Sequence, residues 1–113
     1  MPPSLFVSNT DPLGEQIQRG FPRVKVVKTL HTMNAFVMAA PSLIAGGDHT
    51  LFVCGNDHEA KAQVTDILRS FGWRDVIDLG DITSARGTES YVSLWLRLWG
   101  ALQIPMFNIK VVR

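Results

Sequence analysis

The side chains best suited to catalysis or metal binding in this chain are three histidines and one cysteine. His31, His49 and His58 show neither the i, i+4 spacing nor the H-E-x-x-H pattern that sets two imidazoles on one helix face for a metal ion. Cys54 ends an apolar run and has no base spaced to activate it, which favours a buried small side chain over a nucleophile. The sequence therefore predicts no metal site and assigns no catalytic residue, and spacing does not support a small hydrolase built on Cys54 or His31.

Known phosphate-binding motifs are absent from the chain. Neither the G-x-G-x-x-G turn of dinucleotide-binding proteins nor the G-x-x-x-x-G-K-[ST] loop occurs. The turn at 53–57 leads from an expected strand into an expected helix, where backbone N–H groups can receive an anion. Because Asp57 and Glu59 already bring negative charge to that helix end, simple capping is the favoured interpretation.

His31 and Arg86 are the remaining candidates for contact with a ligand. His31 follows the β-branched run Val24–Leu30, and open α/β sheets bind ligands at the carboxyl ends of their strands. An imidazole there can donate a hydrogen bond or act as an acid. The Arg86 guanidinium can bind a carboxylate or phosphate, or it can pair with Glu89 three residues later, and the sequence leaves both interpretations open.

Apolar periodicity and turn residues divide the chain into strands and helices that must position these side chains. Strands are expected over about 4–8, 24–30, 50–55, 76–80 and 109–112, and helices over about 12–19, 33–38, 56–71 and 83–102. This alternation predicts one α/β domain over residues 1–113, with a partial Rossmann-like, mostly parallel sheet and helices on its faces. The last helix is apolar on more than one side, through Trp95, Leu96 and Trp99.

Composition narrows the classes of function. With 113 residues, 46% hydrophobic and 19% charged, the chain is typical of a small globular protein with a core. A formal net charge of +1 without a run of one sign argues against a nucleic-acid partner. No apolar run reaches the roughly 18 to 20 residues of a membrane span, and residues 1–4 do not resemble a signal peptide, so no membrane partner is expected. A single cysteine fits a reducing compartment, and we expect a cytoplasmic protein.

Seven segments stand in an order that is known from one family. They are Val27–Asn34, Gly47–Asp57, Phe71–Trp73, Ile77–Ile82, Ser84–Glu89, Leu94–Leu102 and Pro105–Lys110. Together they resemble the bacterial branch of the NADP oxidoreductases of the deazaflavin-dependent (coenzyme F-420) type. The resemblance covers essentially the whole chain and corresponds to the C-terminal portion of such a protein.

The resemblance implies a Rossmann-type reductase in which NADP(H) and a deazaflavin or flavin-like acceptor exchange a hydride. It assigns cofactor contacts to His31, Thr32, Met33, Pro105, Met106, Phe107 and Asn108. The family's N-terminal half, with its glycine-rich fingerprint, has no counterpart here, so we expect the isolated chain to bind neither cofactor tightly and to show little reductase activity. His31 stands where the family commonly has Asn, which changes the hydrogen-bonding geometry at this position.

The alternative from another class is a non-catalytic oligomerisation or assembly module. The apolar surface around Trp95 and Trp99 is suited to a partner subunit, and a partial Rossmann sheet leaves an edge that must be covered. We therefore expect either a homo-oligomer or a partner that supplies the missing dinucleotide-binding half.

Overall fold

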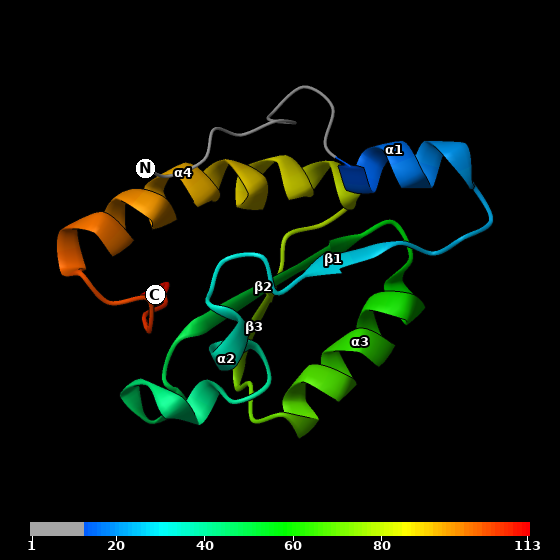
Figure 1. Ribbon diagram of the computed structural model, residues 1–113. Coiled ribbons are helices and arrows are strands. Elements are labelled where there is room, and N and C mark those ends of the chain that lie inside the picture. The colour runs from blue at the N-terminus through cyan, green and yellow to red at the C-terminus, as the bar shows by residue number, and fades with distance from the viewer. Residues whose placement is uncertain (1–12) are drawn as a thin grey trace.

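The computed structural model describes residues 13–113 (Figure 1), and the strand expected over 4–8 lies outside them. The helices are α1 (Leu13–Gly20), α2 (Ala35–Met38), α3 (His58–Ser70) and α4 (Ala85–Leu102), the strands are β1 (Val27–Thr29), β2 (Thr50–Gly55) and β3 (Asp75–Asp78), and the short 3-10 helices are η1 (Pro41–Leu43), η2 (Ala45–Gly47) and η3 (Ile82–Ser84). Helix α3 covers one side of the small sheet, and α1 and α4 lie on the other (Figure 1). The expected α/β class is confirmed.

The sheet has the order β1-β2-β3 and mixes two kinds of pairing. Strands β2 and β3 are parallel, with Thr50 opposite Asp75, and α3 connects them as a βαβ unit. Strand β1 is antiparallel to β2, with Val27 opposite Gly55 and Thr29 opposite Val53. The parallel pairing expected from alternating strands and helices therefore holds for β2 and β3, whereas β1 reverses direction.

One expected strand is shorter in the structure and another does not form. In both places, side chains form hydrogen bonds with backbone groups that would otherwise pair in a sheet. The strand expected over 24–30 shortens to Val27–Thr29. Gln18 of α1 donates from Nε2 to the Val24 carbonyl at 2.6 Å and accepts from the Val26 N–H at 3.1 Å. At the other end of the chain no strand forms over 109–112, since the Val111 N–H donates to the Thr50 hydroxyl, at 2.9 Å, in place of a backbone carbonyl.

The core lies where β2 meets α2, α3 and the residues after α3. Its main cluster consists of Met33, Val37, Leu51, Leu68 and Trp73. A smaller cluster joins Cys54 to Ile82 and Ala85, and burial raises the pKa of the Cys54 thiol to about 11. Cys54 is therefore a buried thiol, as its apolar run predicts, and it stays protonated at neutral pH.

Candidate functional site

The two segments expected to contact cofactors lie against the same core cluster. Thr32 and Met33, just after β1, are both buried. Met106 of the C-terminal tail packs against the cluster that contains Met33. Residues 31–33 and 105–108, more than 70 positions apart in the sequence, thus converge in the fold.

The C-terminal tail is held in place by aromatic stacking and by an amide. Phe107 stacks on Trp95 of α4, with ring centroids 5.1 Å apart. The Asn108 amide donates to the Thr50 carbonyl at 2.9 Å and to His49 Nδ1 at 2.8 Å. With Nδ1 accepting, the second imidazole nitrogen of His49 carries the proton and donates to the Pro41 carbonyl, 2.8 Å away. His49, for which the sequence indicated no role, is therefore a buried link between the tail and β2.

The position of His31 corrects one expectation. Because β1 is antiparallel to β2, the chain that leaves β1 heads toward the amino ends of β2 and β3, not toward their carboxyl ends. The tail reaches the same end, since Asn108 contacts Thr50 at the start of β2. The candidate site formed by residues 31–33 and 105–108 consequently lies near the amino end of β2.

The electrostatic surroundings of His31 favour its neutral form. Partial burial and the nearby positive charge of Lys28 lower the pKa of His31 below its ordinary value of 6.5. At neutral pH the imidazole therefore offers one N–H donor and one acceptor nitrogen.

This lowered pKa predicts that protein stability depends on pH through His31. As pH falls below 6.5, the unfolded chain takes up a proton at this position before the folded chain does, so the free energy of unfolding decreases until the lowered pKa is passed. Chemical denaturation of the wild type and of His31→Asn between pH 7 and pH 5 measures this effect. We expect the wild type to lose more stability than the variant over that interval, and parallel curves for the two proteins would contradict the assignment.

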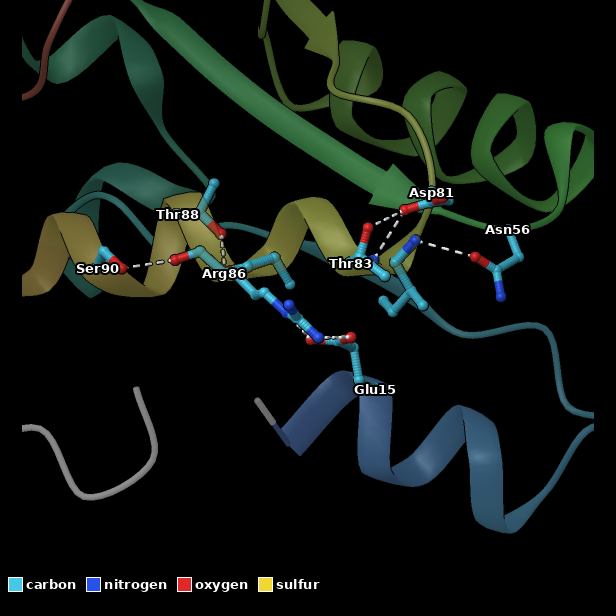
Figure 2. A network of polar contacts seen from close by, with 9 residues as sticks. Glu15, Asn56, Asp81, Thr83, Arg86, Thr88 and Ser90 are labelled. Atoms are coloured by element: carbon cyan, nitrogen blue, oxygen red, sulfur yellow. Dashed lines mark hydrogen bonds and ion pairs between the residues drawn. The ribbon is translucent and has the colours of Figure 1, made fainter. Parts of the chain in front are cut away.

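The carboxyl edge of β2 and β3 carries a different polar network, drawn in Figure 2. Asn56, just after β2, accepts from the Ile82 N–H at 2.9 Å, and Asp81 accepts from the Thr83 N–H at 3.0 Å. Asp57 caps α3 by accepting from the Ala60 N–H at 2.8 Å, which confirms the capping interpretation. Asn56, Asp57 and Asp81 thus each accept a hydrogen bond from a backbone N–H group of this chain.

The sequence leaves open whether Arg86 binds an anionic ligand or pairs with Glu89, and the structure shows a further partner. Its guanidinium makes a bidentate pair with Glu15 of α1, with N···O distances of 2.8 and 2.9 Å (Figure 2). Glu89 faces Lys28 of β1 instead, at 3.5 Å. The pair with Glu15 therefore joins α4 to α1.

A cavity of about 220 Å³ lies beside the candidate site. Its walls come from β2, from the segments that follow β1 and β3, from the first half of α4 and from the tail, and consist of Thr32, Phe52, Leu79, Gly87, Thr88, Tyr91 and Ile109. The sequence analysis assigned no role to Tyr91. No local sequence signal singles out the Tyr91 hydroxyl, because the lack of a partner among the described residues depends on the fold.

The described residues were also searched for a metal site and for a membrane-spanning helix. In the part of the chain from 13 to 113, no group of three His, Cys, Asp or Glu side chains is arranged to hold a metal ion. None of the helices in that part combines the length and apolar character that crossing a membrane requires.

Comparisons with known proteins agree with the sequence resemblance. No family model matches the chain. A solved structure described as a putative F420-dependent NADP reductase, from Arthrobacter sp. FB24, matches all of this chain at 61% identity with a TM-score of 0.96, over 51% of its own length. Among curated proteins, Metalloreductase STEAP3 of Rattus norvegicus is 31% identical over 85 residues, which are 75% of this chain and 16% of that protein. The chain thus spans about half of one relative and a smaller part of the other, and its resemblance to NADP oxidoreductases of the coenzyme F-420 type is confirmed.

Proposed function

We propose that this chain is the C-terminal, acceptor-side portion of an NADP(H)-dependent oxidoreductase that transfers a hydride between NADP(H) and a deazaflavin or flavin-like acceptor. The observation that carries the proposal is the 61% identity, over every residue of the chain, to a protein described as an F420-dependent NADP reductase. The convergence of residues 31–33 and 105–108 in the fold supports it, because these are the segments to which the resemblance assigns cofactor contacts.

The residues of this chain are better suited to contact a cofactor ring than to bind the dinucleotide phosphates. Thr32 has a buried hydroxyl without a hydrogen-bond partner among the described residues, and Met33 and Met106 offer apolar contact close by. Such surroundings fit the polar edge of a flat ring. At the N-terminus of α3, the Asp57 carboxylate already occupies the position that a dinucleotide phosphate would take.

In the proposed complex the bound cofactors supply the hydride chemistry, and this chain supplies position and electrostatics. Asn108, tied to His49 and to the Thr50 carbonyl, fixes the tail against β2. His31, neutral at pH 7, donates or accepts a hydrogen bond without adding a positive charge beside the reacting rings.

The proposal predicts that the chain alone binds NADPH poorly and that the missing part of the reductase restores binding. Calorimetric titration of the isolated chain should show no saturable heat change at micromolar NADPH. A fusion to the part of the Arthrobacter protein that this chain does not match, in the order of that protein, should bind NADPH at micromolar concentration. Micromolar binding by the isolated chain would contradict the proposed division of labour, and a folded fusion that fails to bind would contradict the proposed function.

A second candidate function is that of an assembly module, and the surface of α4 favours it. Leu94, Trp99 and Leu102 are each about half exposed, and Ile104 follows them just past the helix. Helix α4 lies on the outside of the described fold (Figure 1). Such an apolar strip is suited to a second copy of the chain or to the missing half. Sedimentation at several concentrations tests the second copy as partner, since a monomer at every concentration argues against self-assembly.

A further inference from the structure

Leu30, which lies between β1 and His31, has a backbone conformation that is rare for a bulky side chain. Its φ is +59°, in the left-handed region, where the Cβ atom comes too close to the following carbonyl oxygen. Glycine, which has no Cβ, is the residue that ordinarily adopts this conformation. Among residues 13–113, Ala45 and Gln103 are the only other non-glycine residues with a positive φ. A leucine at this position therefore carries strain that the surrounding structure has to offset.

Contacts on both sides of Leu30 hold it in this conformation. The Thr29 hydroxyl donates to the Phe52 carbonyl at 2.7 Å, which fixes the chain just before it. The half-buried Leu30 side chain packs against the main core cluster. On the far side, Thr32 is buried. Because both ends are fixed, the left-handed residue determines the direction in which residues 31–33 leave β1.

Both segments of the candidate site begin close to a left-handed residue. Residues 31–33 follow Leu30 directly, and residues 105–108 begin two positions after Gln103. Gln103 ends α4, and a left-handed residue is common just past a helix. Leu30 follows a strand, which needs no such cap. Since Leu30 and Met106 of the tail pack against the same core cluster, the strain at Leu30 is associated with the placement of the two segments.

We propose that Leu30 is a positioning residue of the candidate site. Its left-handed backbone, anchored by its side chain in the core, sets the placement of His31 and Thr32 relative to the tail. The inference rests on the proposed function, in which residues 31–33 contact a cofactor ring. Glycine at position 30 relieves the strain but removes the anchor. It should therefore cost the fold less than alanine does, while it allows residues 31–33 to leave β1 in other directions.

Alanine and glycine variants of the full chain test the strain. Both Leu30→Ala and Leu30→Gly remove the apolar side chain, and the glycine variant should have the higher denaturation midpoint, because alanine keeps the strained Cβ. Ile44 is the matched control, since it packs against the same cluster and its φ of −130° is ordinary. There the order should be reversed, with Ile44→Gly less stable than Ile44→Ala.

Backbone amide resonances of the same variants test the placement of the two segments. Leu30→Gly should broaden or double the resonances of 31–33 and of 105–108, because the first segment then adopts several directions beside the tail. Leu30→Met keeps an apolar anchor at this position and should leave the resonances of 105–108 as they are in the wild type. The tail is more than 70 positions away in the sequence, so its resonances report on the fold and not on the substitution itself.

The fusion that restores the missing part of the reductase tests the consequence for the reaction. With NADPH as the donor and riboflavin as the acceptor, Leu30→Gly should lower kcat about 10-fold or more, with little change in the KM for NADPH, because a misplaced contact leaves fewer complexes in the reactive orientation. Leu30→Met should restore kcat. Ile44→Gly should keep the wild-type kcat although it lowers the stability of the fold.

Failure of this inference and failure of the proposed function give different results. If the wild-type fusion neither binds NADPH nor reduces riboflavin, the proposed function is wrong, and the resonances of 31–33 and 105–108 still decide whether Leu30 positions these segments. The inference is overturned if Leu30→Gly is less stable than Leu30→Ala, or if those resonances are unchanged in Leu30→Gly. It is equally overturned if an active fusion keeps its kcat when Leu30 is replaced by glycine.

Discussion

Replacing Trp73 with alanine is expected to lower the free energy of unfolding by about 4 kcal/mol, a large share of the roughly 5–15 kcal/mol that holds a small domain folded. The indole is 1% exposed and belongs to the main core cluster. Its N–H donates to the Met38 carbonyl at 2.8 Å, and its ring meets His49 edge to face at 5.0 Å. Alanine leaves a cavity, an unpaired carbonyl and an imidazole without its aromatic neighbour.

The consequence extends to the candidate site, because His49 also holds Asn108 of the tail. Chemical denaturation measures the stability change, and the amide resonances of 105–108 report on the tail. Phe71→Ala is the matched control: an aromatic ring two residues away, 45% exposed, whose loss should cost less than about 1 kcal/mol. The loss of stability for Trp73→Phe should lie between the losses for Trp73→Ala and Phe71→Ala. A loss below about 1.5 kcal/mol for Trp73→Ala would contradict this view of the core.

The elements predicted well from the sequence are those whose signals are local. The unbroken apolar run at 50–55 is β2, buried along most of its length. Helix α3 begins after its cap and ends before Gly72, where a positive φ of 106° suits glycine. Such caps, turns and apolar runs act within a few residues, so they can be recognised without knowing the fold.

The faces of helices were harder to predict, because burial depends on which neighbours the helix meets. Ile67 is a large apolar residue of α3, yet it is 56% exposed. Lys61 is buried in its place and donates to Asp78 at 3.0 Å and to the Gly80 carbonyl at 3.1 Å. A lysine satisfied by groups 17 and 19 residues away leaves no trace in the local pattern.

The cofactor contacts that the resemblance assigns stay a prediction, whereas the direction of the strand before His31 could not be foreseen from the sequence. The resemblance named residues 31–33 and 105–108, and the fold brings these segments together at the core. The direction of β1, which places them near the amino end of β2, depends on pairing between distant strands and could not be read from alternating elements. Likewise, the Tyr91 hydroxyl is found to lack a partner among residues 13–113 only when every nearby acceptor is known.

The pair between Arg86 and Glu15 joins residues 71 positions apart, so it could not be predicted from local sequence. Removing this pair is the second change with a large expected effect. Arg86→Met should lower the free energy of unfolding by about 2–3 kcal/mol, because Glu15, only 5% exposed, then keeps a buried carboxylate without its cation. The Arg86 side chain is 45% exposed, so the loss lies below the largest values known for buried pairs. The change should loosen α1 from α4, since this bidentate pair joins the two helices.

A double-mutant cycle with Glu15→Gln and Arg86→Met separates the pair from the rest of the helix contact. Because both charges are gone in the double variant, it should be more stable than the sum of the single losses predicts. Lys110→Met is the matched control, because Lys110 contacts Asp48 at 2.7 Å on the surface, where both side chains are exposed. Its denaturation midpoint should stay close to that of the wild type, since water screens such a pair. Equal losses for Arg86→Met and Lys110→Met would show that the burial of Glu15 adds nothing, and strictly additive losses in the cycle would show that Arg86 and Glu15 stabilise the chain independently.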